Sequence, residues 1–353
     1  MRHSALTGPW EMSEALSEMK KDALPREELH PVRGAALLRG LHRVVPLGRK
    51  YHPLLGLMNS SHGLLSIPFE RNRVIQPAAW RKQTATLLLM GRGMIPEFSL
   101  LAPICRGLKS GAMIDVGANI GLYTLSLRAE SPLPIIAYEP QPFLFKLLQW
   151  NIAFNELPDI EARNLACGAQ RGEVPFAVGI NGSVVAPTGE NARDASVIGD
   201  VEGWEKEALV TQRGKALIKV PLVTLDEDLA NVPEISLLKI DCEGFECGIL
   251  EGALKLISKH KPVLFLEAHP PVLGMYGRTV REVLDLVAPH YDLEFWYYQL
   301  EPRSSKFKQS LAKFRRPRAR QCADARAMLE LCDSDPQPPQ LYFIGRPKNK
   351  SQP

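Results

Sequence analysis

Long apolar runs, paired cysteines and an apolar N-terminal segment are all absent from this chain of 353 residues. No apolar run approaches the roughly 18 residues that a membrane-spanning helix needs, and the polar, acidic N-terminal residues do not fit a secretory signal. The six cysteines form no C-x-x-C pair, which argues against a zinc site or a disulfide framework and is typical of free thiols in a reducing compartment. These absences predict a cytoplasmic protein.

The composition is otherwise ordinary for a folded domain, with 45% hydrophobic and 23% charged residues. A formal net charge of +4 is too small to mark a nucleic-acid-binding protein by itself. Nucleic acid is therefore not the expected partner, and the distribution of the charge along the chain matters more than its sum.

Apolar strand-like runs alternate with helix-like segments over residues 93–346, which we predict to form one α/β domain. Continuous apolar strands that alternate with helices indicate a parallel sheet covered by helices on both faces. Two segments interrupt the pattern: a Gly-, Asn- and Asp-rich stretch at 179–216, expected to be a long loop or lid, and a basic, then Pro-rich insertion at 302–339. Residues 1–92 are expected to be an extension of short helices, a strand at Leu64–Phe69 and partial disorder, and 347–353 a tail.

A glycine-containing turn follows the first apolar strand of this domain. Gly117 lets the chain turn tightly, Gly121 lets a helix and a ligand approach closely, and the backbone N–H groups between them, from Ala118 onward, favour a carboxylate. Asn119 stands where the dinucleotide fingerprint G-x-G-x-x-G requires a glycine, which argues against a nicotinamide or flavin cofactor.

Two acids complete the expected cofactor site. Asp115, at the end of the first strand, fits the ammonium or sulfonium side of a cationic, amino-acid-bearing ligand. Glu139, at the tip of the second strand, fits the ribose hydroxyls by the same logic that places an acid there in dinucleotide folds. Together these residues predict S-adenosylmethionine as the cofactor.

Several segments, taken in order, resemble the FkbM family of methyltransferases. They lie at 114–124, 137–140, 164–168, 223–226, 238–246 and 265–269, and the resemblance covers residues 96–299. The string Lys-Ile-Asp-x-Glu-Gly-Phe-Glu that starts at Lys239 is the most specific of them. The resemblance implies a class I methyltransferase, Rossmann-like fold with a mostly parallel seven-stranded sheet and an antiparallel last strand. It also implies S-adenosylmethionine as donor, a loop that reaches Thr124, and usually a hydroxyl oxygen of a sugar or secondary metabolite as acceptor.

Methyl transfer to a hydroxyl requires the acceptor oxygen to be held in line with the sulfonium methyl and its proton to be removed. Candidates for this chemistry end the fourth and fifth strands of the domain. We expect Asp241 to orient the cofactor or substrate, and Glu243, Glu267 or His269 to act as the base. Asp241, Glu243 and Glu267 could also hold a divalent cation, which sequence spacing does not decide.

Other transfer chemistries fit the sequence less well. The fourth strand ends in Asp241-Cys-Glu-Gly244, not in the Asn/Asp-Pro-Pro-aromatic element typical of amino-nitrogen methylation. Cys242 lacks the preceding proline of pyrimidine carbon methyltransferases, and strand alternation predicts that it points away from the crevice. Two rivals remain: an RNA or protein methyltransferase that docks through residues 303–320, and a cofactor-binding module without activity.

Residues 303–320 contain eight basic residues and no acid. Phe307, Leu311 and Phe314 are spaced so that a short helix would be apolar on one side and basic on the other. Such a helix would suit the surface of an anionic membrane, and its charge would also suit phosphate groups.

Overall fold

Within the part of the chain that the structure describes, eight strands form the central sheet of the computed structural model, in the order β15-β14-β16-β13-β12-β4-β5-β6. Their bounds are β4 Ala112–Val116, β5 Ile135–Tyr138, β6 Ile160–Arg163, β12 Ile235–Ile240, β13 Val263–Ala268, β14 Tyr291–Tyr298, β15 Ala319–Gln321 and β16 Leu341–Pro347. The structure describes residues 24–44, 51–59, 62–95, 97–177, 183–184, 196–197, 216–298, 319–334 and 339–348.

The pairing of these strands confirms the predicted fold class. β6, β5, β4, β12 and β13 are parallel neighbours, and β16 runs antiparallel between β13 and β14. This is the Rossmann-like arrangement of class I methyltransferases, in which the last strand is inserted antiparallel. The sheet nevertheless has one strand more than the seven expected, because β15, which lies within the basic and Pro-rich insertion, pairs with the outer edge of β14.

Helices cover both faces of the sheet, because each strand carries apolar side chains on both of its faces. On one face α5 (Phe98–Gly107) and α6 (Leu122–Glu130) pack over Met113 and Phe265. On the other, α10 (Glu246–Glu251), α11 (Leu254–His260) and α13 (Val280–Val287) pack over Ile114 and Leu238. The other helices that the structure describes in this part are α7 (Pro142–Phe154), α9 (Leu225–Asp228), α12 (Pro270–Met275) and α15 (Ala325–Ser334).

Two short helices, α10 and α11, follow β12. A Cβ atom at Gly252 would lie 2.0 Å from the carbonyl oxygen of Gly168, so another stretch of backbone passes directly against this point. α10 therefore ends at Glu251, and the Asp226 carboxylate accepts hydrogen bonds from the first-turn N–H groups of α11 at Lys255 and Leu256.

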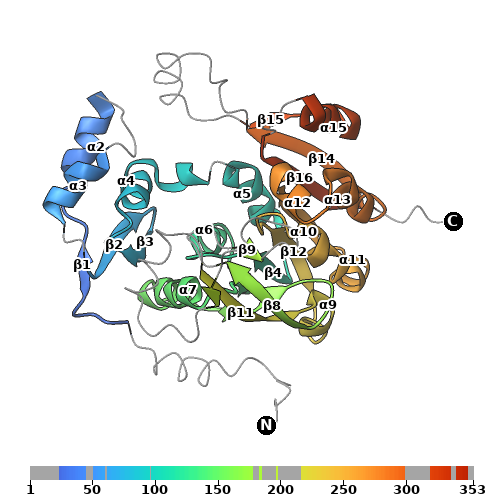
Figure 1. The fold of residues 1–353 in the computed structure, drawn as a ribbon, viewed down its shortest axis with the longest axis horizontal. Coiled ribbons are helices and arrows are strands. Elements are labelled where there is room, and N and C mark those ends of the chain that lie inside the picture. Colours follow the sequence, from blue (N-terminus) through green and yellow to red (C-terminus); the bar gives the residue numbers. More distant parts are fainter. Residues whose placement is uncertain are drawn as a thin grey trace, which may run out of the picture.

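The N-terminal elements form a second, three-stranded sheet with its own helices (Figure 1, left). They are β1 (Leu29–Pro31), α2 (Ala35–Val44), α3 (His52–Met58), β2 (Leu64–Phe69), β3 (Asn72–Pro77), α4 (Arg81–Met90) and the 3₁₀ helix η2 (Gly91–Met94). The predicted strand at Leu64–Phe69 is confirmed. Asn151 of α7 and Asn155, the C-cap of this helix, hold β3 through hydrogen bonds to the backbone of Ile75 and Arg73. The extension is thus joined to the sheet domain by a shared interface.

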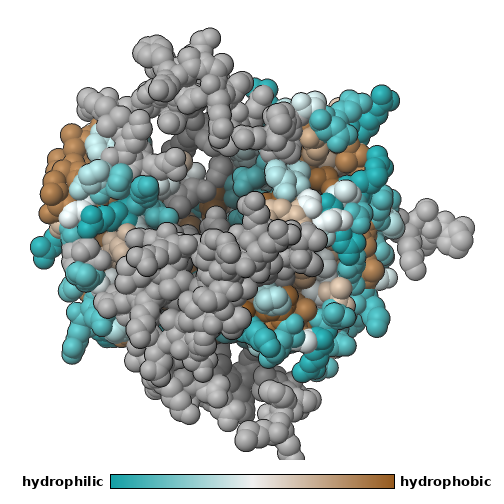
Figure 2. Space-filling view, in the orientation of Figure 1, coloured by the Kyte–Doolittle hydropathy of each residue, from teal (hydrophilic) through white to brown (hydrophobic). Residues whose placement is uncertain are grey.

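Part of the N-terminal surface is apolar. Leu37 of α2 and Leu57 of α3 are 53% and 84% exposed, and Figure 2 shows a hydrophobic patch at the left, where Figure 1 places these helices.

Among the described residues no single helix has the length and apolar character to cross a membrane. The segments Arg81–Gly93 and Phe98–Gly107 meet that requirement only as a pair, bent by 50°.

Five short strands form a separate small sheet beside the central one: β7 (Ala166–Cys167), β8 (Gly172–Ala177), β9 (Ser183–Val184), β10 (Ser196–Val197) and β11 (Ala216–Val223). Most of the expected lid at 179–216 lies outside the described residues. The same holds for positions 303–318 of the basic segment, so its expected membrane contact stays a prediction.

Candidate active site

The carboxyl ends of β4, β5, β12 and β13 surround a cavity of about 350 Å³, which we call the donor cavity. This is the edge where open parallel sheets bind their ligands. Seven of the residues predicted from the sequence line it: Gly117, Asn119, Glu139, Asp241, Glu243, Glu267 and His269. Ala118 borders an adjoining cavity, Gly121 is the N-cap of α6, and Asp115 and Thr124 line neither.

The turn between β4 and α6 depends on left-handed backbone at three positions. Gly117, Asn119 and Gly121 have φ angles of 80°, 52° and 93°, and asparagine is one of the few residues besides glycine that adopts this region readily. Asn119 thus satisfies a backbone requirement that glycine meets in dinucleotide-binding loops. The N–H groups of Gly117 and Ala118 both donate to the carbonyl of Tyr138, which ties the turn to β5.

Gly117 also lies against the backbone of β12. A Cβ atom there would be 1.9 Å from the carbonyl oxygen of Asp241. We expect Gly117→Ala to displace the turn and to destabilise the fold by about 2–4 kcal/mol, from backbone strain and the close contact together. It should also weaken, more than tenfold, the binding of S-adenosylhomocysteine, which is the expected cofactor without its methyl group. Urea unfolding and calorimetric titration would measure both. Gly107→Ala, where no atom lies within 4 Å of the new Cβ, is the matched control; equal effects of the two substitutions would contradict this account.

Glu139 follows β5 directly and is 4% exposed. Its two carboxylate oxygens accept hydrogen bonds from the N–H groups of Asn119 and Gln141, at 2.8 and 2.9 Å. Burial raises the pKa of this carboxyl to about 7, although the two N–H groups oppose the shift. Each oxygen retains a lone pair, so Glu139 can hold the turn in place and still accept hydrogen bonds from two hydroxyls.

Asp115 and Thr124 do not reach the cavity, contrary to the expectation of direct ligand contact. Asp115 is fully buried, accepts a hydrogen bond from Thr124 Oγ1 at 2.7 Å, and lies 2.9 Å from Nζ of the equally buried Lys239. The sheet register makes Lys239 and Asp115 direct neighbours on β12 and β4. The acid is therefore neutralised inside the protein and is not available to a cationic ligand.

Lys239 connects this ion pair to the turn between β4 and α6, residues 117–121, which we call the cofactor turn. Its Nζ donates to the carbonyls of Val116 and Gly117, at 3.3 and 3.2 Å, and lies 4.4 Å from the centre of the Tyr123 ring. Burial opposes the charge of Lys239, but the nearby Asp115 carboxylate outweighs it and raises the lysine pKa above its usual value. The ammonium therefore stays charged and holds the start of the turn through these two hydrogen bonds.

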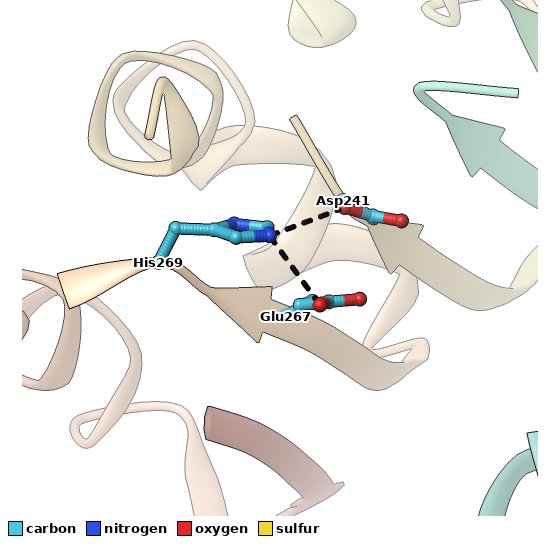
Figure 3. Close-up of side chains that lie close together, drawn as sticks. All are labelled: Asp241, Glu267 and His269. Atoms are coloured by element: carbon cyan, nitrogen blue, oxygen red, sulfur yellow. Dashed lines mark ion pairs between the residues drawn. The ribbon is translucent and has the colours of Figure 1, made fainter. Parts of the chain in front are cut away.

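Four carboxylates surround His269 at the ends of β12 and β13 (Figure 3 draws two of them). Its Nδ1 is 2.9 Å from Glu246 Oε1, and its Nε2 is 3.3 Å from Glu267, 3.7 Å from Glu243 and 3.9 Å from Asp241. Glu246 is fully buried and also accepts the N–H of Gly244. This acid, in the first turn of α10, is a positioning residue that fixes the imidazole ring.

The charges of this cluster determine its protonation. Burial alone would lower the pKa of His269, but hydrogen bonds to Glu246 and Glu267 raise it to about 11. Burial, and then repulsion by Asp241, raises the pKa of Glu267. At neutral pH His269 is accordingly a cation among carboxylates, with no lone pair left to accept a proton.

The turn after β12 is strained where it meets the cavity. Glu243 and Gly244 have φ angles of 46° and 96°, and glutamate rarely adopts this region. Burial raises the pKa of Glu243, whose side chain is 34% exposed. Cys242 borders the cavity and also packs against the apolar cluster that contains Ile240 and Cys247. That its thiol points away from the crevice stays a prediction. Burial raises its thiol pKa well above the usual value, which leaves it a poor nucleophile.

Comparison with known proteins gives a family match. Residues 115–321, more than half of the chain, match the model of the methyltransferase FkbM domain. The chain is 28% identical over 145 residues to Methyltransferase 1 of Beauveria bassiana (strain ARSEF 2860), covering 40% of this chain and 57% of that protein. It is 29% identical over 156 residues to Methyltransferase sdnD of Sordaria araneosa, covering 40% and 59%.

Solved structures include a methyltransferase FkbM from Methylobacillus flagellatus KT, with 16% identity and a TM-score of 0.36. The alignment covers 74% of this chain and 54% of that one. The chain thus spans a little over half the length of each of the two methyltransferases that it matches in sequence.

Proposed function

Because the chain belongs to the FkbM methyltransferase family, we propose that it transfers a methyl group from S-adenosylmethionine to a hydroxyl oxygen of a saccharide or specialised metabolite. The observation that carries the proposal is the convergence of Gly117, Glu139 and Asp241 on the donor cavity. Glu139 would accept the ribose hydroxyls, and the N–H groups of the turn would face the methionine carboxylate. The carboxylates around His269 would lie near the positively charged sulfonium.

In the proposed reaction the acceptor oxygen attacks the methyl carbon, and the carbon–sulfur bond breaks with its electron pair passing to sulfur. The hydroxyl proton passes to a carboxylate. We assign Glu243 as the base, because its raised pKa makes it a better proton acceptor than an ordinary carboxylate and its side chain is the most exposed of the cluster. Asp241 would orient the hydroxyl, and His269 would hold the carboxylates in place.

S-adenosylmethionine labelled with ¹³C in the methyl group tests the reaction. After incubation with phenyl β-D-glucoside, catechol and a short RNA hairpin, product spectra would distinguish methyl groups on oxygen, nitrogen and carbon. Label on oxygen of a small molecule supports the proposal. Label only on RNA would favour the rival in which residues 303–320 dock nucleic acid.

Binding of the cofactor product should depend on pH through Glu139. Ribose hydroxyls favour the ionised carboxylate, whose pKa burial raises to about 7. Affinity for S-adenosylhomocysteine should therefore rise about tenfold between pH 6 and pH 8 and level off above. The effect on stability has the opposite sign, because a raised carboxyl pKa contributes stability that is lost as pH rises through 7. Glu139→Gln should weaken binding about tenfold to a hundredfold and abolish this pH dependence. A pH dependence unchanged in Glu139→Gln would reject the assignment.

We also propose that the cluster can hold a divalent cation. Asp241, Glu267 and His269 could each supply one ligand atom, and these atoms all lie within 4.8 Å of one another. Because His269 is protonated at neutral pH, the cation would have to displace the proton on Nε2, so its binding should strengthen as pH rises. Two carboxylates and an imidazole suit Mg²⁺, Mn²⁺ or Zn²⁺, which would polarise the acceptor hydroxyl. Titration with Mn²⁺, followed by electron paramagnetic resonance, should show one site that is lost in Glu267→Gln and retained in Glu161→Gln. Unaltered Mn²⁺ binding in Glu267→Gln, or no binding at all, would rule the cation out.

A further inference from the structure

A second cavity, of about 550 Å³, adjoins the donor cavity, and N-terminal elements form its outer wall. Gln76 of β3, Trp80 just before α4, and Gln83 and Leu87 within α4 line that side. The opposite wall is the cofactor turn and the start of α6. This space falls within the range of about 300–1,000 Å³ that is typical of small-molecule sites.

The two cavities share a wall. Ile95, Gly117, Asn119 and Asp241 border both of them. A ligand in the second cavity would therefore approach Asp241 while the donor occupies the first. Such adjoining sites are what an in-line transfer between two bound molecules requires.

The wall of the second cavity is nearly free of charge. Among the described residues that line it, Asp241 is the only one with a charged side chain; the others are apolar, aromatic or amide residues and the turn. Trp80 and Tyr123 offer ring surfaces, and Gln83 offers an amide that can both donate and accept hydrogen bonds. Among these described residues a phosphate or carboxylate would find no cationic side chain, and Asp241 would repel it.

The outer wall is held in place by a short chain of hydrogen bonds. Gln76 donates through Nε2 to Thr84 Oγ1 at 2.7 Å, and Thr84 donates to the carbonyl of Trp80 at 2.9 Å. Trp80 packs edge-on against Phe143 of α7, with ring centres 5.9 Å apart. Because this wall is already ordered before a ligand arrives, less conformational entropy is lost when the ligand binds.

We propose that the second cavity is the acceptor site and that it takes an uncharged, hydroxyl-bearing molecule with an apolar face, such as a glycoside of an aromatic or aliphatic alcohol. This inference rests on the proposed methyl transfer, for which Asp241 is the meeting point of donor and acceptor. It gives the N-terminal extension a role in substrate choice.

Saturation-transfer NMR with phenyl β-D-glucoside, in the presence of S-adenosylhomocysteine, tests the assignment. Phenyl β-D-glucuronide is the charged counterpart, since it differs by a carboxylate on the same scaffold. The glucoside should bind and the glucuronide should bind at least tenfold more weakly. Gln83→Trp, which fills the cavity, should reduce glucoside binding at least tenfold, whereas Lys82→Trp, at the exposed neighbouring position of α4, should leave it unchanged.

Calorimetric titration of the same samples with S-adenosylhomocysteine separates this inference from the proposed function. Equal binding of both glycosides, or glucoside binding unaffected by Gln83→Trp, would overturn the acceptor assignment while cofactor binding stands. Loss of S-adenosylhomocysteine binding in Gln83→Trp would instead place this cavity within the donor site. Failure of the wild type to bind S-adenosylhomocysteine would reject the proposed function itself. Gln83→Ala, which removes only the amide, guards against misfolding of the tryptophan variant and should weaken glucoside binding about threefold to tenfold.

Discussion

Lys239→Met should lower the free energy of unfolding by about 3–5 kcal/mol, the usual cost of removing one partner of a buried ion pair. Methionine preserves the length of the apolar stem but leaves the Asp115 carboxylate buried and without its cation. The cofactor turn would also lose the two hydrogen bonds that Lys239 donates to Val116 and Gly117. Urea unfolding followed by circular dichroism measures the change.

A double substitution separates the ion pair from simple packing. In Lys239→Met with Asp115→Asn the buried charge is gone from both sides, so about half of the lost stability or more should return. Additive losses from the two substitutions would show that the pair does not act as a unit.

Asp241→Asn should reduce kcat by roughly a hundredfold, the cost expected when the group that orients the acceptor oxygen is lost. Asp241 borders both cavities and lies between Lys239 and His269, at 3.8 and 3.9 Å from their nitrogen atoms. The amide would keep the shape of the side chain but not the charge that faces the acceptor hydroxyl. Release of S-adenosylhomocysteine, with the acceptor that the wild type methylates, gives the rate.

The control for this substitution is Asp285→Asn, which makes the same chemical change at an exposed position of α13. It should leave kcat within twofold. An Asp241→Asn enzyme with kcat within threefold of the wild type would show that Asp241 takes no part in the reaction.

The sequence predicted the central sheet well, because its strands are continuous apolar runs and its helices carry apolar faces. It did not predict β3 or α4, and the reason is visible at Asn151 and Asn155. These asparagines hold the N-terminal sheet through backbone hydrogen bonds, and such a polar contact leaves no mark in hydrophobic periodicity. The break between α10 and α11 depends on the backbone of Gly168, which is distant in sequence.

At the site, the residues that line the donor cavity could be placed by their positions at strand ends. Contacts between side chains on neighbouring strands could not be predicted in this way, because they depend on the register of the strands. Lys239 shares a strand face with Asp241, which alternation indicates, but only the pairing with β4 brings it to Asp115. Glu246 is an acid in the first turn of α10, and only the fold shows that His269 lies 2.9 Å from it.

Calorimetric titration of the wild-type protein with S-adenosylhomocysteine tests the central claim most directly. The account predicts one binding site per chain, with affinity weakened at least tenfold in Glu139→Gln and unchanged in Asp285→Asn. Absence of binding in the wild type, or equal affinity in the wild type and Glu139→Gln, would contradict it.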